Sequence, residues 1–230
     1  MFPIGDDNPT RSQPVVTIGL VAACVLIFVY QLTLPAAAAE AFIFRWGFIP
    51  SEVLGPGGLG PESDELPAWS RIFTSMFLHG DIMHIIGNML FLWIFGNNIE
   101  DTFGKIRFVI FYLLCGTAAA FTQAFTDAAS NVPMIGASGA ISGVLGAYLW
   151  LFPQARIRVL VMFGIITVVH MRALIVLGLW FVLQLVNAAL TPVSEEGGVA
   201  FWAHVGGFVA GLALMPVFRP ARPRVRGPWG

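Results

Sequence analysis

The chain has 230 residues, of which 57% are hydrophobic and only 11% are charged, whereas about a quarter are charged in an ordinary soluble domain. With a mean hydropathy of +0.80, this composition indicates an integral membrane protein. The net charge of −1 excludes a strongly basic nucleic-acid binder. Both cysteines, Cys24 and Cys115, fall inside apolar runs, which excludes a disulfide scaffold or a thiolate zinc cluster.

Six stretches without Asp, Glu, Lys or Arg are long enough to span a membrane, since a helix needs about 20 apolar residues to cross roughly 30 Å of hydrocarbon. They are 12–39, 82–99, 108–126, 128–155 (interrupted by Pro133 and Pro153), 173–194 and 197–218. A seventh stretch, 159–171, is too short, and we expect an interfacial or re-entrant segment there. The sequence therefore predicts an all-α membrane protein with six transmembrane helices and a long outer loop between helices 1 and 2.

The basic residues predict the orientation, because Lys and Arg are enriched on the cytoplasmic side of membrane helices. With the amino terminus inside, only Arg45 and Arg71 lie outside, and the outer segments are acidic. We therefore expect both termini in the cytoplasm and the protein in the bacterial cytoplasmic membrane. The predicted cytoplasmic basic residues are Arg11, Lys105, Arg107, Arg156, Arg158, Arg172, Arg219, Arg222, Arg224 and Arg226.

The chain is predicted to have one membrane domain, 15–218, between a cytoplasmic segment, 1–14, and a cytoplasmic Arg/Pro-rich tail, 219–230. The first apolar stretch lacks a basic segment before it and a small-residue cleavage site after it, so we expect it to remain as helix 1. In the long outer segment, the Gly/Pro-rich run 55–61 is typical of a mobile loop, and 36–48 of a short surface element.

Three helices that run from outside to inside carry unusual polar residues near their outer ends. His84, Ser138 and His204 precede the charged residues that end their helices by 15 to 18 positions, or roughly 22 to 27 Å at ~1.5 Å per residue. They therefore lie at similar depth. Polar side chains within a membrane are costly, so several that coincide suggest a functional site.

Ser138 lies in the motif Gly136-Ala137-Ser138-Gly139, which is typical of a serine on a turn that starts a helix. Such a position exposes the hydroxyl and directs free backbone N–H groups toward the same point. Taken alone, the motif also fits simple glycine packing. After it, small residues recur at helical spacing and allow another helix to approach closely: Gly139, Ser142, Gly143 and Gly146.

Helix 6 has a matching face, because Gly207 and Gly211 follow His204 at offsets of 3 and 7. If the two small-residue stripes pack together, His204 reaches Ser138 and can serve as its general base. The alternative is a packing motif with an uninvolved histidine.

Helix 2 contributes His84 and Asn88, which share one face and can both donate hydrogen bonds to an oxyanion. A structural interhelical bond is the alternative for this pair. His79 and His84 could also be imagined as metal ligands, but the chain has no His-Glu-x-x-His pattern and the cluster contains no carboxylate or cysteine. We therefore expect no metal and no cofactor.

Together these residues resemble the rhomboid intramembrane serine proteases. The resemblance covers about residues 69–214 and rests on motifs in the family's order: Arg71-Ile72-Phe73-Thr74, His79, His84-Ile85-Ile86-Gly87-Asn88, Gly136-Ala137-Ser138-Gly139, and Ala203-His204 with Gly207 and Gly211. It implies six helices around a water-accessible cavity, a catalytic Ser138/His204 dyad without a carboxylate, and a partly embedded outer loop. It also implies an oxyanion hole formed by His84, Asn88 and the Ser138 N–H.

Two positions depart from the family pattern. Some relatives carry an aromatic residue four positions after the nucleophile, stacked on the catalytic histidine, where this chain has Ser142. The family's Trp-Arg pair appears here as Trp69-Ser70-Arg71, so Arg71 carries over more directly than Trp69. Neither departure removes a reacting group.

The resulting prediction is a serine endopeptidase that cleaves transmembrane protein substrates in or near their membrane segments, with lipid as its other partner and no nucleic acid. The resemblance to rhomboid proteases also implies substrate access between helices 2 and 5. A non-catalytic rhomboid-like protein that binds membrane helices is one alternative. A small transporter is another, and it would require buried carboxylates that the sequence places elsewhere. The sequence leaves the oligomeric state and the roles of Ser142 and His170 open, although His170 is expected at the cytoplasmic interface.

Overall fold

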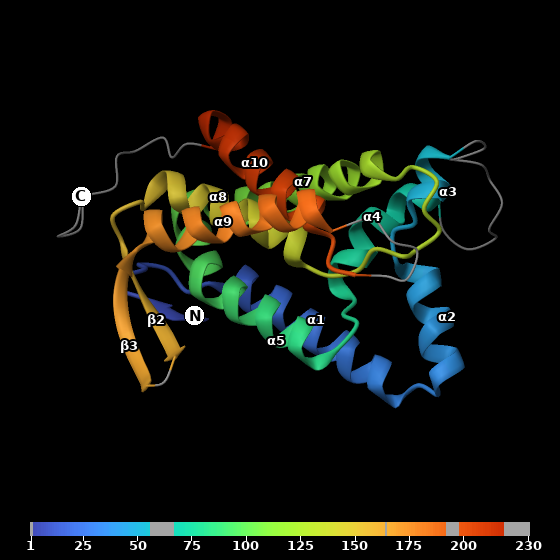
Figure 1. Cartoon of the computed structure of the whole chain (residues 1–230), viewed down its shortest axis with the longest axis horizontal. Coiled ribbons are helices and arrows are strands. Elements are labelled where there is room, and N and C mark those ends of the chain that lie inside the picture. Colours follow the sequence, from blue (N-terminus) through green and yellow to red (C-terminus); the bar gives the residue numbers. More distant parts are fainter. Residues whose placement is uncertain (1, 56–66, 164, 192–197, 219–230) are drawn as a thin grey trace.

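The computed structural model describes residues 2–55, 67–163, 165–191 and 198–218. Their helices lie mostly along one long axis, with a small sheet at one end and the short helices α2 to α4 at the other (Figure 1). The helices and strands are β1 (Phe2–Asp6), α1 (Val15–Thr33), α2 (Ala36–Trp46), α3 (Pro50–Leu54), η1 (Ala68–Ser70), α4 (Arg71–Thr74), η2 (Ser75–Phe77), α5 (Ile82–Phe91), the π-helical η3 (Leu92–Gly96), α6 (Asn97–Phe103), α7 (Lys105–Thr126), α8 (Ser138–Leu151), β2 (Arg156–Phe163), β3 (Ile165–Arg172), α9 (Ala173–Leu190) and α10 (Phe201–Phe218).

The predicted helical bundle is confirmed. Among the described residues, five helical segments are long and apolar enough to cross a membrane: α1, the continuous segment Ile82–Phe103, α7, α9 and α10. The sixth predicted crossing corresponds to α8, which has 14 residues and is therefore only about 21 Å long. Every residue of α8 from Gly139 to Tyr148 is buried, so the other helices surround it.

The first part of the stretch 128–155 is not helical, and the helix begins at Ser138, as the motif Gly136-Ala137-Ser138-Gly139 predicted. The chain from Asp127 to Ala137 runs as an irregular segment before α8 begins at Ser138. Met134 pairs in extended conformation with Phe48, and Gly136 has a φ of +118°, a value that favours glycine. Pro133 lacks the amide proton that a helix interior requires.

The stretch 159–171, where we expected an interfacial or re-entrant segment, lies in strands β2 and β3 of a three-stranded antiparallel sheet with the order β1-β2-β3. Its residues alternate with period two: Ile157 and Val159 are buried, whereas Arg156 and Arg158 are exposed. The sequence analysis missed the sheet because β1 comes from the amino-terminal segment, more than 100 positions away. His170 lies exposed on β3, opposite Arg158.

The amino-terminal strand is held by two carboxylates. Asp6 Oδ2 accepts hydrogen bonds from the Tyr148 hydroxyl at 2.5 Å and from Asn98 Nδ2 at 3.0 Å. Asp7 Oδ1 accepts from the Arg156 backbone N–H at 2.8 Å. Burial raises the pKa of Asp6 to about 6. The strand thus connects to the carboxyl-terminal end of α8.

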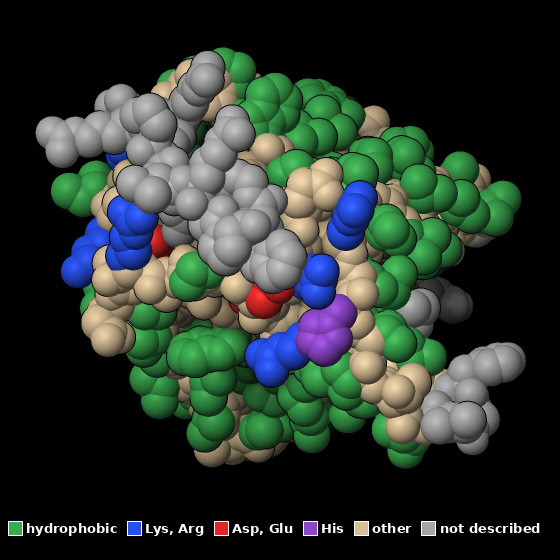
Figure 2. Space-filling model, turned by 90° about the vertical axis from the view of Figure 1, so that its left-hand side faces the viewer, with side chains coloured by type: hydrophobic (Ala, Val, Ile, Leu, Met, Phe, Trp, Pro, Cys, Tyr) green, Lys and Arg blue, Asp and Glu red, His purple; other side chains and the backbone are tan. Residues whose placement is uncertain are grey.

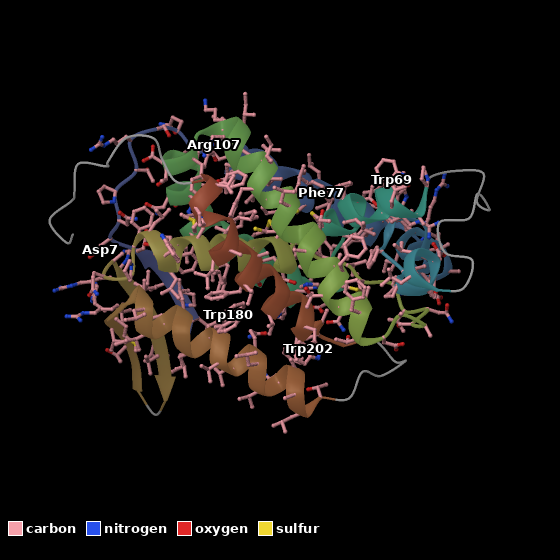
Figure 3. The ribbon with its side chains drawn as sticks, turned by 90° about the horizontal axis from the view of Figure 1, so that it is seen from above. Asp7, Trp69, Phe77, Arg107, Trp180 and Trp202 are labelled. Atoms are coloured by element: carbon pink, nitrogen blue, oxygen red, sulfur yellow. The ribbon has the colours of Figure 1, made fainter. Side chains whose placement is uncertain are left out.

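Basic side chains gather at the end of the molecule that carries the sheet (Figure 2). Asp7 and Arg107 lie at this end, and Trp69 lies toward the opposite one (Figure 3). Arg107 donates to the Val217 carbonyl at 2.9 Å, which brings the start of α7 beside the end of α10. The predicted grouping of basic residues on one side is therefore present in the fold. The Arg/Pro-rich tail and most of the run 55–61 lie outside the described residues.

At the other end, the predicted short surface element is confirmed as α2. The Phe48 and Met134 backbones exchange two hydrogen bonds, of 3.0 and 2.8 Å, and Ser51 N–H donates to the Ser130 carbonyl at 3.0 Å. Arg71 is buried and forms an ion pair with Glu52. These contacts join the connection after α1 to the irregular segment that precedes Ser138.

The tightest packing in the fold is the seam between α8 and α10. A methyl group at Gly207 would lie 2.0 Å from the Gly139 carbonyl oxygen, and one at Gly211 would lie 2.1 Å from the Gly143 carbonyl oxygen. On α8, a methyl group at Gly146 would lie 2.4 Å from the carbonyl oxygen of Phe208 on α10. Backbone atoms therefore meet directly, as the two small-residue stripes predicted.

We expect Gly207→Ala to lower the thermal unfolding midpoint in detergent by several degrees, because overpacking against a rigid backbone costs about 1–3 kcal/mol. Gly178→Ala on α9 is the matched control, since a methyl group there meets nothing within 4 Å. Equal thermal unfolding midpoints for the two variants would contradict direct backbone packing between α8 and α10.

Asp6 predicts a pH dependence of stability. The pKa of its carboxyl rises from the ordinary value of 3.8 to about 6 in the folded chain, which therefore binds the proton more tightly. The resulting stabilisation is complete below about pH 4 and is lost as the pH rises through 6. Relative to Asp6→Asn, the wild-type unfolding midpoint should therefore fall between pH 4 and pH 7. A difference between the two unfolding midpoints that stays constant with pH would contradict the raised pKa of Asp6.

Candidate active site

Ser138 is the first residue of α8, directly after a turn that only glycine accommodates easily. Gly136 donates its N–H to the Ser75 carbonyl at 2.9 Å, which fixes the turn against η2. Because the first N–H groups of a helix have no partner within the helix, the Ser138 N–H is available at the start of α8. The turn and the helix start therefore place the Ser138 hydroxyl and the available Ser138 N–H close together.

His204 reaches Ser138 across the α8–α10 seam. Its Nε2 lies 2.8 Å from Ser138 Oγ, within hydrogen-bond distance. Gly207 and Gly211, on the same face of α10, allow this approach. On the opposite side of the ring, His204 Nδ1 lies 2.8 Å from Gln184 Oε1 of α9. The sequence analysis missed Gln184, because no spacing within α9 relates it to residues of α10.

Aromatic rings flank His204. The Trp180 ring lies 6.0 Å from the imidazole at an interplanar angle of 36°, and the Phe201 ring lies 6.3 Å away at 89°. Trp180 and Gln184 share one face of α9 at a spacing of four. Figure 3 shows Trp180 between α9 and α10.

His84 and Asn88 of α5 converge on the same turn. A methyl group at Gly136 would lie 2.7 Å from His84 Nε2 and 3.7 Å from Asn88 Nδ2. Asn88 is buried, and its Nδ2 has no hydrogen-bond partner among the described residues. Asp81 caps α5, its Oδ1 accepting from the His84 N–H at 2.9 Å, and so holds the first turn of this helix. The structure thus brings all four predicted site residues together.

His79 packs beside this cluster. Its ring lies 5.1 Å from that of His84 in an edge-to-face arrangement. Burial, with a smaller effect from His84, lowers the pKa of His79 to about 4, so it is neutral at neutral pH. Its backbone exchanges hydrogen bonds with the Gln31 amide of α1. Within the described part of the chain, no three His, Cys, Asp or Glu side chains form a group that could hold a metal.

The site opens into a cavity of about 750 Å³ between α5, α8, α9 and α10. Its polar lining includes the four predicted site residues, with Trp180 and Phe91 among its apolar lining. A preorganised hydroxyl, a ring nitrogen that can accept its proton, and convergent N–H donors are the groups that acyl transfer requires.

The comparison with known proteins agrees with this geometry. A family model described as the Rhomboid domain matches residues 67–221. The chain belongs to the rhomboid family. Together with its apolar helices, this membership identifies an integral multi-pass membrane protein.

Several rhomboid relatives are similar over part of their length. RHOMBOID-like protein 5 of Arabidopsis thaliana is 32% identical over 150 residues, which cover 63% of this chain and 42% of the relative. Rhomboid protease GluP of Bacillus subtilis (strain 168) is 32% identical over 146 residues, which cover 64% of this chain and 26% of the relative. Rhomboid protein 1, mitochondrial, of Saccharomyces cerevisiae is 32% identical over 104 residues, which cover 44% of this chain and 30% of the relative. The chain thus matches less than half the length of each.

Proposed function

We propose that this rhomboid-family protein is an intramembrane serine endopeptidase that cleaves peptide bonds in or near transmembrane segments of other membrane proteins. The observation that carries the proposal is the 2.8 Å contact between Ser138 Oγ and His204 Nε2 inside a cavity of the helical bundle. Membership of the family and the similarity to a relative named as a protease support it.

In the proposed reaction, Ser138 Oγ attacks the carbonyl carbon of the scissile bond while its proton passes to His204 Nε2. The carbonyl oxygen becomes an oxyanion, for which Asn88 Nδ2, the Ser138 N–H and His84 are the proposed donors. His204 then gives the proton to the leaving amine as the C–N bond breaks. Water, activated by His204 in the same way, hydrolyses the acyl-enzyme.

The unpartnered amide of Asn88 supports the oxyanion-hole assignment. A buried donor without a partner costs about 1–3 kcal/mol, and a ligand oxygen would recover that energy. Here the donor lies within 4 Å of a methyl position on Gly136, two residues before the proposed nucleophile. Donors fixed in this way interact most strongly when negative charge develops on the substrate.

A substrate must present an extended segment to this site. Because a regular helix hydrogen-bonds its own carbonyls, the scissile region has to unwind, and helix-destabilising residues favour this. We propose access between α5 and α9. Phe91 and Trp180 line the cavity there, while Phe181 stacks on Phe208 at 4.4 Å and so serves packing. Both termini are proposed to lie in the cytoplasm of a bacterial cell.

Ser138→Ala and His204→Ala should each abolish cleavage of a single-pass model substrate in liposomes, because each removes one partner of the proton transfer. His170→Ala, which alters an exposed histidine on β3, is the matched control and should cleave like the wild type. Residual cleavage by Ser138→Ala would overturn the serine mechanism. A folded wild type that cleaves no helix-destabilised substrate would instead favour a non-catalytic protein that binds membrane helices.

Asn88→Ala should lower kcat about 100-fold and leave KM nearly unchanged, since its proposed hydrogen bond forms only as the oxyanion develops. Asn187→Ala, at an exposed position of α9, serves as the control for loss of an amide. A change confined to KM would place Asn88 in substrate binding instead.

A further inference from the structure

The aromatic residue that stacks on the catalytic histidine in some relatives is replaced here by Ser142, which has a different task. Its hydroxyl donates to the Ser138 carbonyl within α8 at 2.7 Å. Its Cβ also faces the seam, 3.3 Å from a methyl position on Gly207. Ser142 therefore belongs to the helix packing, and the orientation of His204 has to come from other residues.

Gln184 meets His204 at the nitrogen that Ser138 does not use. Its Oε1 lies 2.8 Å from Nδ1, while Ser138 Oγ lies 2.8 Å from Nε2. The imidazole is thus held at both ends, from α8 and from α9. Trp180, one turn before Gln184, and Phe201 limit rotation of the ring from its sides.

We propose that Gln184 is a positioning residue that selects the reactive tautomer of His204. The amide oxygen accepts the Nδ1–H, so Nε2 carries a lone pair and accepts the proton of the Ser138 hydroxyl. In the other tautomer, Nε2 holds a proton and has no lone pair with which to accept one. This inference rests on the proposed protease function and adds a third member to the proposed dyad.

A neutral amide is suited to this position. In soluble triads a carboxylate orients the histidine by accepting the hydrogen of the ring nitrogen that the nucleophile does not use. The Gln184 oxygen supplies the acceptor without a charge. The contact also links α9 to α10 at the site, because Gln184 lies on α9 and His204 lies on α10.

The decisive experiment compares Gln184→Leu, Gln184→Asn and Gln184→Glu in the full-length protein. Leu keeps the size but removes the acceptor, Asn keeps the amide but is one methylene too short, and Glu keeps both length and an acceptor oxygen. We expect Leu and Asn to lower kcat at least tenfold with little change in KM, and Glu to recover most of kcat. Asn187→Leu, at an exposed site of the same helix, should leave both constants unchanged.

Labelling of Ser138 by a small fluorophosphonate separates positioning of His204 from substrate docking, because this probe needs no helix to enter. Its labelling rate should fall at least tenfold in Gln184→Leu and Gln184→Asn, and it should be close to wild type in Gln184→Glu. Unchanged labelling in the Leu variant would overturn the inference, and so would a Glu variant as slow as Leu.

A direct readout is the ¹⁵N spectrum of the histidines, with the His204 signals assigned by comparison with His204→Ala. The wild type should show His204 protonated at Nδ1, and Gln184→Leu should populate the form protonated at Nε2. An Nε2-protonated His204 in the wild type would overturn the inference without any activity measurement. If the wild type neither cleaves a substrate nor labels at Ser138 while its His204 is protonated at Nδ1, the proposed protease function fails but the Gln184 contact stands.

Discussion

The direct contact of backbone with backbone between α8 and α10 is the constraint on which the site depends. Gly207 and Gly211 lie directly against the backbone carbonyls of Gly139 and Gly143. In lipid, helices gain little from hydrophobic association, so close van der Waals packing must hold them together. The same closeness sets the distance from Ser138 to His204. Stability and reactivity thus rest on one set of glycines.

Several polar groups of the bundle form hydrogen bonds with partners on distant parts of the chain. Glu100, buried in α6, accepts hydrogen bonds from the Val16 and Thr17 N–H groups and so caps α1. Asp6 and Tyr148 bind the amino-terminal strand to α8. Because hydrocarbon offers no hydrogen bonds, each such pair stabilises one particular arrangement of helices. The Asn88 amide, which has no partner among the described residues, differs from these groups and faces the cavity.

Irregular backbone occurs directly before the proposed nucleophile. In the irregular segment before Ser138, Met134 pairs with Phe48, and the positive φ of Gly136 then turns the chain into α8. His84 lies so close to Gly136 that a methyl group would collide with its ring. Non-helical backbone at membrane depth is tolerated when it is covered by protein or lines a cavity, and residues 132–135 line the cavity here. The turn therefore presents the Ser138 hydroxyl to that cavity.

The sequence by itself determined the membrane class, the apolar helices and four of the residues that meet at the cavity. These follow from local chemistry: hydropathy over a window, glycine spacing on one helix face, and the rarity of histidine, serine and asparagine within apolar runs. Only the tertiary structure decided that Gln184 contacts His204, that the amino-terminal strand completes a sheet with 156–172, and that Met134 pairs with Phe48 before α8 begins. Each of these depends on contacts between positions far apart in the chain, whose free energy no local pattern records.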